Sequence, residues 1–237
     1  MAALRHPDDL LRVGTSAQSV LRPLELTAGL DAVFSSPIFG AGIDRQRVSA
    51  FRFSLGGVTV LAAAGGRMNG SLSAEHCSNN AQADLGFCEG EPGGVPMLIW
   101  LRLRRAVCRV PPVNLDQDLY NRRFQLRVLA APAGLPFDNL SAVTVPVMLP
   151  RVGADVTLRF PYHAQRLHLR LLKPNRYEVI EGSHHYVFLS PFPDRITKEV
   201  GRPAQDRLGF DRRPFLNRMN AEIVRFFQGC FAAISGG

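Results

Sequence analysis

The stretch FRFSLGGVTVL, residues 51–61, decides how the rest of the chain is interpreted. Apolar side chains occupy every second position from residue 51 to 55, which is the period of a strand with one buried face. The Gly56-Gly57 pair supplies a tight turn, and the apolar run at 58–61 is typical of a returning strand. The stretch therefore predicts a β-hairpin.

The same alternation recurs along most of the chain. It predicts further strands at 97–110, 123–130, 142–149, 155–160, 165–172, 176–180 and 185–189. A Gly-, Ser- and Asn-rich stretch at 65–94 predicts a long surface loop, with one short strand in it as an alternative. Together these segments predict a mainly β fold, a sandwich or partly open barrel of about eight short strands with a C-terminal amphipathic helix.

Only the two ends of the chain depart from the strand pattern. Residues 1–16 predict a flexible lead-in, followed by one or two short helical pieces between 15 and 34. Residues 17–237 then form a single β-rich domain that ends in a helix at about 212–231, with Asp211 as its N-cap. The apolar stripe of this helix predicts packing over the sheet, and the alternative is a partner interface. The side chains that would form this interface are Phe226, Phe227 and Phe231.

Basic charge is the strongest compositional feature. The chain has 28 Lys and Arg against 20 Asp and Glu, a net charge of +8, which suggests an anionic partner. All basic residues except Lys173 and Lys198 are arginine, and they are spread over the chain without forming a block. Binding of nucleic acid through Arg-bearing strand faces is therefore an alternative function that the composition does not favour. No apolar run reaches the roughly 18 to 20 residues of a membrane helix, so we expect no membrane partner.

Recognised catalytic motifs are missing from the sequence. There is no G-x-S-x-G of the serine hydrolases, no phosphate-binding glycine loop and no H-E-x-x-H metal motif. The four cysteines lack zinc spacing and predict reduced thiols in a cytosolic or nuclear protein. We therefore predict no catalytic residue, no cofactor and no metal, and a protein that is not an enzyme.

A pair of adjacent histidines is the strongest sequence feature against the prediction that the protein is not an enzyme. His184 and His185 are adjacent, and adjacent side chains in a strand point to opposite faces, so only one of the two can reach a given site. A divergent hydrolase built around His184 or His185 is the weaker alternative, against a polar hairpin tip without function.

The chain has arginine in place of lysine, Pro- and Gly-rich loops, and short β segments. In these three features it resembles accessory proteins of GC-rich herpesviruses. The segments that carry a closer resemblance are residues 86–90 (GFCEG), 101–105 (LRLRR) and 210–231. Through these segments, and in size and basic charge, the chain resembles the small nuclear phosphoprotein family of the alphaherpesviruses. The resemblance implies a non-enzymatic accessory or regulatory protein of the infected-cell nucleus, with some cytoplasmic protein. It would act through protein–protein interactions with viral or host nuclear proteins, in an oligomeric state that stays open.

Two kinds of short signal fit a nuclear phosphoprotein. The densest basic cluster consists of Arg102, Arg104, Arg105 and Arg109. It is a candidate nuclear-import signal, and the alternative is the solvent-exposed face of a strand. The candidate phosphorylation sites, each also readable as an ordinary loop serine, are Ser49 in a basophilic context and Ser36 and Ser190 before proline.

Overall fold

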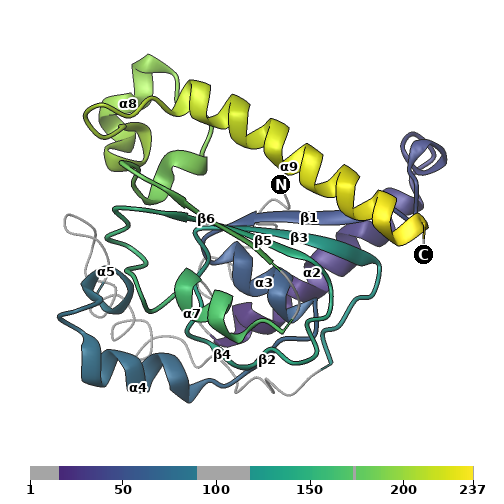
Figure 1. The fold of residues 1–237 in the computed structure, drawn as a ribbon, viewed down its shortest axis with the longest axis horizontal. Helices are drawn as coiled ribbons and strands as arrows, with labels where there is room; N and C mark the ends of the chain where they lie inside the picture. The colour runs from purple at the N-terminus through teal and green to yellow at the C-terminus, as the bar shows by residue number, and fades with distance from the viewer. Residues whose placement is uncertain (1–15, 90–117, 173–174, 237) are drawn as a thin grey trace.

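The core of the computed structural model, which describes residues 16–89, 118–172 and 175–236, is a parallel β-sheet (Figure 1). Its four strands, in the order β1-β3-β5-β6, are β1 (Val48–Phe53), β3 (Phe124–Ala130), β5 (Val147–Val152) and β6 (Asn175–Ile180). A separate antiparallel pair joins β2 (Arg67–Met68) to β4 (Phe137–Asn139). Because all neighbouring strands of the main sheet are parallel, their carboxyl ends meet at one edge.

Helices cover both faces of the main sheet. Their bounds are α2 (Ser16–Phe34), α3 (Gly56–Ala62), α4 (Ser71–Asn80), α5 (Leu85–Cys88), α7 (Ala164–Arg170), α8 (Asp194–Val200) and α9 (Arg212–Ser235). Three short 3-10 turns are η1 (Gly40–Gly42), η2 (His185–Phe188) and η3 (Arg202–Ala204). Helices α2, α3 and α7 lie on one face and α9 crosses the other, so the molecule has three layers (Figure 1).

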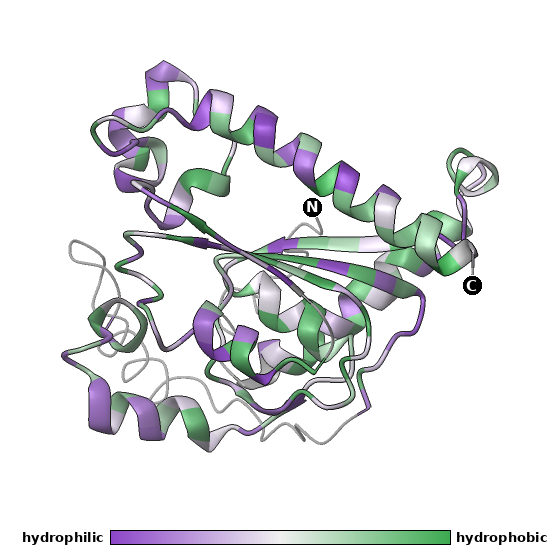
Figure 2. Cartoon of the chain, in the orientation of Figure 1, coloured by the Kyte–Doolittle hydropathy of each residue, from purple (hydrophilic) through white to green (hydrophobic). Residues whose placement is uncertain are grey.

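Each face of the sheet has its own apolar core. Leu129 and Leu149 pack with α2, α3 and α7, whereas Val128 and Met148 pack with Phe215 of α9 on the other side. Figure 2 shows α9 with alternating hydrophilic and hydrophobic turns above strands that are largely hydrophobic. Strands buried on both faces belong to parallel sheets covered by helices, which is the arrangement observed.

The prediction of a mainly β sandwich or barrel is wrong, because 45% of the described residues are helical and only 16% lie in strands. The first error is at residues 56–62, where Gly56 and Gly57 begin helix α3 instead of turning a hairpin. Every residue of α3 after Gly56 is buried. A short run that is apolar on all sides has no period, so its sequence does not separate a buried helix from a strand.

A second error is at residues 165–172, where leucines at every second position predict a strand and the structure has α7. Leu167 is fully buried and Leu171 packs against the same core, whereas Leu169 between them is 72% exposed. The buried pair is therefore spaced i, i+4, as on one face of a helix.

The remaining predicted segments divide into three groups. Strands are found where 123–130 and 176–180 predict them, and β5 overlaps 142–149. β1 covers only residues 51–53 of the predicted strand at 51–55, because Ser54 and Leu55 form the turn into α3. Residues 155–160 are irregular, 185–189 contain η2, and the predicted loop at 65–94 carries β2, α4 and α5. The predicted strand at 97–110 and residues 1–15 of the lead-in lie outside the described residues.

The C-terminal helix α9 begins where the N-cap signal predicts. The carboxylate of Asp211 accepts a hydrogen bond from the N–H of Arg213 and so satisfies a free donor of the first turn. Phe215, Met219 and Ile223, spaced by four, are buried against the sheet. Among the described residues, no helix combines the length and apolarity needed to span a membrane.

Candidate active site

Ser54 occupies the sharp turn between β1 and α3. Its φ angle is 55°, a left-handed conformation that is uncommon for a residue with a side chain. The Ser54 N–H donates to the carbonyl of Ala130 at the end of β3 (2.9 Å), and the Ser54 carbonyl accepts from the N–H of Gly57 (2.9 Å). A Cβ on Gly57 would lie 2.7 Å from Cβ of Pro132, so α3 starts in close contact with the loop after β3. These contacts hold Ser54 at the carboxyl edge of the sheet.

His185 joins Ser54 to a carboxylate at this edge. The Nε2 atom of His185 lies 2.9 Å from Oγ of Ser54, and its Nδ1 atom lies 2.8 Å from Oδ2 of Asp155. Ser54 follows β1, Asp155 follows β5 and His185 follows β6. Three segments far apart in the sequence meet here because parallel strands present their carboxyl ends together.

The hydrogen bonds around Asp155 determine which nitrogen of His185 donates and which accepts. Its Oδ1 atom accepts from the N–H groups of Thr157 (2.9 Å) and Leu158 (2.8 Å), which leaves Oδ2 for His185. A carboxylate accepts, so Nδ1–H of His185 donates to Asp155, and Nε2 is then free to accept the hydroxyl proton of Ser54. Asp155 and His185 are buried, whereas Ser54 is half-buried and keeps contact with solvent.

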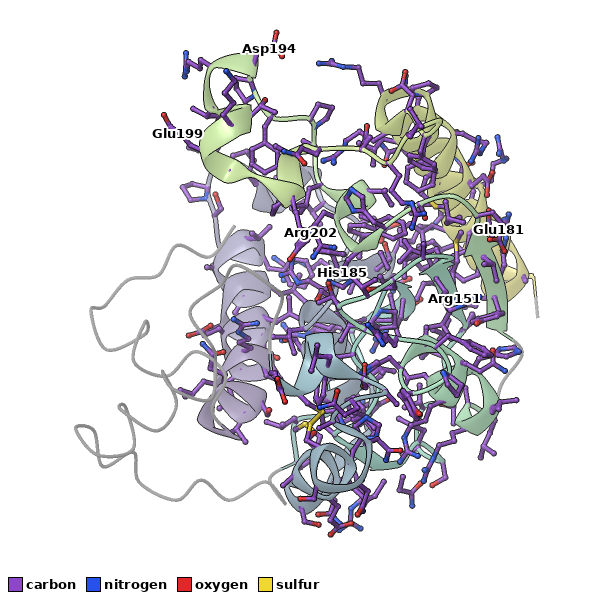
Figure 3. All side chains as sticks on the ribbon, turned by 90° about the vertical axis from the view of Figure 1, so that its left-hand side faces the viewer. Arg151, Glu181, His185, Asp194, Glu199 and Arg202 are labelled. Atoms are coloured by element: carbon purple, nitrogen blue, oxygen red, sulfur yellow. A yellow bond between two sulfur atoms is a disulfide. The ribbon has the colours of Figure 1, made fainter. Side chains whose placement is uncertain are left out.

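Aromatic rings fix the orientation of the His185 imidazole. The ring of Phe53 lies 4.7 Å from it, and the ring of Tyr186 meets it edge-on at 5.2 Å. Figure 3 looks onto this edge of the sheet and shows His185 near its middle, between Arg202 and the pair Arg151 and Glu181.

His184 turns away from the site. Its Nδ1 atom accepts from the N–H of Tyr186 (3.1 Å), and its Nε2–H donates to the carbonyl of Gln205. Only one histidine of the pair thus reaches Ser54, although they sit at the start of a 3-10 turn instead of in a strand.

A backbone donor lies directly beside the serine. The N–H of Leu55, the residue after Ser54, has no hydrogen-bond acceptor among the described residues. A donor at this position is where serine hydrolases stabilise the oxyanion of the tetrahedral intermediate. No group of three or more His, Cys, Asp or Glu side chains that could hold a metal is found in the described ranges.

The site residues predicted from the sequence lie elsewhere. Arg102, Arg104, Arg105 and Arg109 are outside the described residues. Ser36 accepts hydrogen bonds from two N–H groups in the turn after α2, Ser49 is half-buried in β1, and Ser190 is exposed after η2. The rings of Phe226, Phe227 and Phe231 are partly buried on α9, where the first two pack against the core on that face of the sheet.

Ser54 and Asp155 were not identified from the sequence, and only the serine carries a local signal. Residues 52–56, RFSLG, keep the serine and the second glycine of G-x-S-x-G, with Arg52 in place of the first glycine. A Cβ on Gly56 would lie 3.2 Å from Cβ of Arg52, so the larger residue at the first position crowds any side chain at the second.

In comparisons with known proteins, no family model matches the chain and no curated protein sequence matches it.

Proposed function

We propose that this chain is a serine hydrolase that cleaves carboxylic esters, with Ser54 as nucleophile, His185 as general base and acid, and Asp155 as the residue that orients His185. One observation carries the proposal: His185 bridges Oγ of Ser54 at 2.9 Å and Oδ2 of Asp155 at 2.8 Å. Two further features support it. The chain order Ser, Asp, His and a serine on a strained strand-to-helix turn are typical of the α/β-hydrolase fold, an analogy at the level of the fold.

The geometry fits a two-step acyl transfer. Oγ of Ser54 attacks the ester carbonyl carbon while Nε2 of His185 takes the hydroxyl proton. The negative charge that develops on the carbonyl oxygen is stabilised by the N–H of Leu55. As the tetrahedral intermediate collapses, His185 returns the proton to the leaving alcohol and an acyl-serine remains. Water, activated by the same imidazole, then releases the acid and restores the serine.

Covalent labelling tests this proposal directly. A fluorophosphonate forms a bond to an activated serine and loses fluoride, so we expect one adduct per chain, located at Ser54 by peptide mass spectrometry. Hydrolysis of p-nitrophenyl acetate and butyrate gives the matching activity. Both signals should disappear in Ser54→Ala and persist in Ser190→Ala, which removes an exposed serine of another loop.

Two outcomes would contradict the proposal: labelling of other serines at the same rate as Ser54, or ester hydrolysis that persists in Ser54→Ala. The resemblance to the nuclear phosphoprotein family implies a non-enzymatic protein, for which neither signal is expected.

A further inference from the structure

A second buried cluster of titratable side chains lies away from Ser54. Asp84 is fully buried, and its Oδ2 atom lies 2.8 Å from Nε2 of His163 and 3.0 Å from Nε2 of His76. The Nδ1 atom of His163 accepts from the N–H of Gly134 (3.3 Å), so its proton is on Nε2 and is donated to Asp84.

Asp84 is a carboxylate that depends on these donors. Burial alone would raise its pKa, but the hydrogen bonds from His163, from the N–H of Arg159 and from His76 together hold the pKa below its ordinary value. A buried carboxylate is stable only while its donors stay in place. Asp84 therefore ties together the segments that carry these groups.

One of these segments is the loop that carries Asp155, residues 155–159, which we call the acid loop. The Oδ1 atom of Asp84 accepts from the N–H of Arg159 (3.2 Å), and Arg159 Nη1 donates to the carbonyl of Ala83 (3.3 Å). The same loop supplies the two N–H groups that hold Oδ1 of Asp155. The loop is thus fixed from both ends, by Asp155 on one side and by Asp84 on the other.

Gly86 in α5 brings the backbone against the same loop. A Cβ on Gly86 would lie 2.0 Å from the carbonyl oxygen of Val156 and 2.7 Å from Cα of Thr157, so only glycine fits there. Asp84 and Gly86 are four and two residues before Cys88, so both contacts to the acid loop come from one short segment.

A disulfide closes this segment. Cys77 in α4 is bonded to Cys88 in α5, with a Cα–Cα distance of 5.3 Å, so the expectation of reduced thiols is wrong for these two residues. Asp84 and Gly86 lie inside the closed loop, and His76 is adjacent to Cys77. A covalent loop of this kind limits the conformations available to the residues between its ends.

Building on the proposed serine hydrolase, we propose that Asp84 is a positioning residue for Asp155 and that the Cys77–Cys88 disulfide makes this positioning redox-dependent. In the oxidised chain, Asp84 and Gly86 hold the acid loop so that Asp155 points at His185. A dithiol reductant breaks the S–S bond by thiolate attack; its two thiols lose two protons and two electrons to form a disulfide, and Cys77 and Cys88 become thiols. The acid loop then loses part of its support.

The test compares the oxidised full-length chain with the same chain treated with dithiothreitol and then reoxidised. We expect reduction to lower kcat for p-nitrophenyl butyrate by about 10- to 100-fold with little change in KM, because the catalytic geometry and not the binding surface is disturbed. Reoxidation should restore kcat. The double variant Cys77→Ala/Cys88→Ala should resemble the reduced chain and ignore dithiothreitol, whereas Cys108→Ala/Cys230→Ala should keep the response.

Asp84→Asn tests the positioning role without a reductant. It should lower kcat by a similar factor, and reduction of this variant should lower kcat little further, because both changes act through the acid loop. Should Asp84→Asn fail to fold, the comparison of oxidised and reduced wild type still decides the redox part.

A structural readout separates this proposal from the hydrolase proposal. The Nδ1 proton of His185 that is bonded to Asp155 is expected at low field in the proton NMR spectrum and absent in His185→Asn. Reduction should shift or broaden it. An unchanged low-field proton and an unchanged kcat on reduction would overturn the positioning role while Ser54 labelling still supports the hydrolase. A proton that moves on reduction in a chain that is never labelled would support the positioning role and overturn the hydrolase.

Discussion

Among the described residues, two buried aspartates, Asp155 and Asp84, are bonded to histidine, and the two sites differ in what the second ring nitrogen of the histidine meets. In the first, His185 donates to Asp155 and its other nitrogen faces the half-buried hydroxyl of Ser54. In the second, His163 donates to Asp84 and its other nitrogen accepts from the backbone N–H of Gly134. The first pair keeps a base directed at a reactive group, while every polar group of the second is used to hold segments together. A short histidine–carboxylate contact therefore points to catalysis only when the remaining nitrogen faces a nucleophile.

The largest effect that would separate the two pairings is expected for His185→Ala. Without its base, Ser54 has no acceptor for its proton, so kcat/KM for p-nitrophenyl butyrate should fall by about 10⁴-fold or more. His184→Ala is the matched control, since His184 contacts Gln205 and the N–H of Tyr186 instead of Ser54, and its activity should stay within about threefold of wild type, as expected for a change that leaves the reacting groups in place. Equal losses in the two variants would mean that the site was wrongly assigned.

Asp155→Asn should produce a loss of about 10³- to 10⁴-fold in kcat with a folded chain. An amide at this position no longer holds the His185 imidazole in the tautomer and orientation in which Nε2 accepts the serine proton. Steady-state kinetics at neutral pH, with circular dichroism to check folding, measure this. A variant with full activity would show that Asp155 does not orient His185.

Besides its effect on kcat, Asp84→Ala should lower the stability of the fold. It leaves His76 and His163 without their acceptor in a buried site, and breaking such a pair costs about 3 to 5 kcal/mol. Urea unfolding would give the change in the free energy of unfolding. A loss below about 0.5 kcal/mol, the scale of an ordinary surface change, would contradict the role of Asp84 as a structural anchor.

The contribution of Asp84 should also depend on pH in a defined direction. Its pKa is lower in the folded chain than its ordinary value of about 4, so its stabilising contribution is complete above that value. It is lost as the pH falls through the lower folded-state pKa. The difference in unfolding free energy between wild type and Asp84→Asn should be constant from pH 7 to 5 and shrink below pH 4 (roughly, from the ordinary pKa). A difference that grows on acidification would reverse the assigned sign.

Gly86→Ala is expected to have the smallest effect, about 1 to 3 kcal/mol of lost stability, because the added methyl group forces α5 away from Val156. Gly29→Ala in α2 is the control, since a Cβ there meets no atom within 4 Å. Thermal melting of the two variants measures the difference. Similar melting temperatures would show that the acid loop adjusts without cost.

Local sequence determined several elements of this protein. The capped amphipathic pattern after Asp211 predicts the helix found at Arg212–Ser235, and alternation predicts β3 and β6. β3 and β6 carry apolar residues at alternating positions, and α9 has a cap that acts on its own backbone. Such signals depend on residues a few positions apart, so they can be read without the rest of the chain.

The layer arrangement and the site were decided only by tertiary structure. Residues 57–62 are buried on all sides, so packing between β1, β3 and α2 makes them a helix where the sequence pattern allows a strand. Ser54, Asp155 and His185 come together because three parallel strands end at one edge of a sheet. The spacing of the three residues in the sequence does not show that their strands end at the same edge. Two local traces of the site exist in the sequence. One is the adjacent pair His184 and His185, which suggests a divergent hydrolase, and the other is the serine and second glycine at residues 52–56, which a search for the complete G-x-S-x-G pattern rejects. Contacts between distant segments depend on strand order and register, which the chain specifies only through the packing of the whole fold.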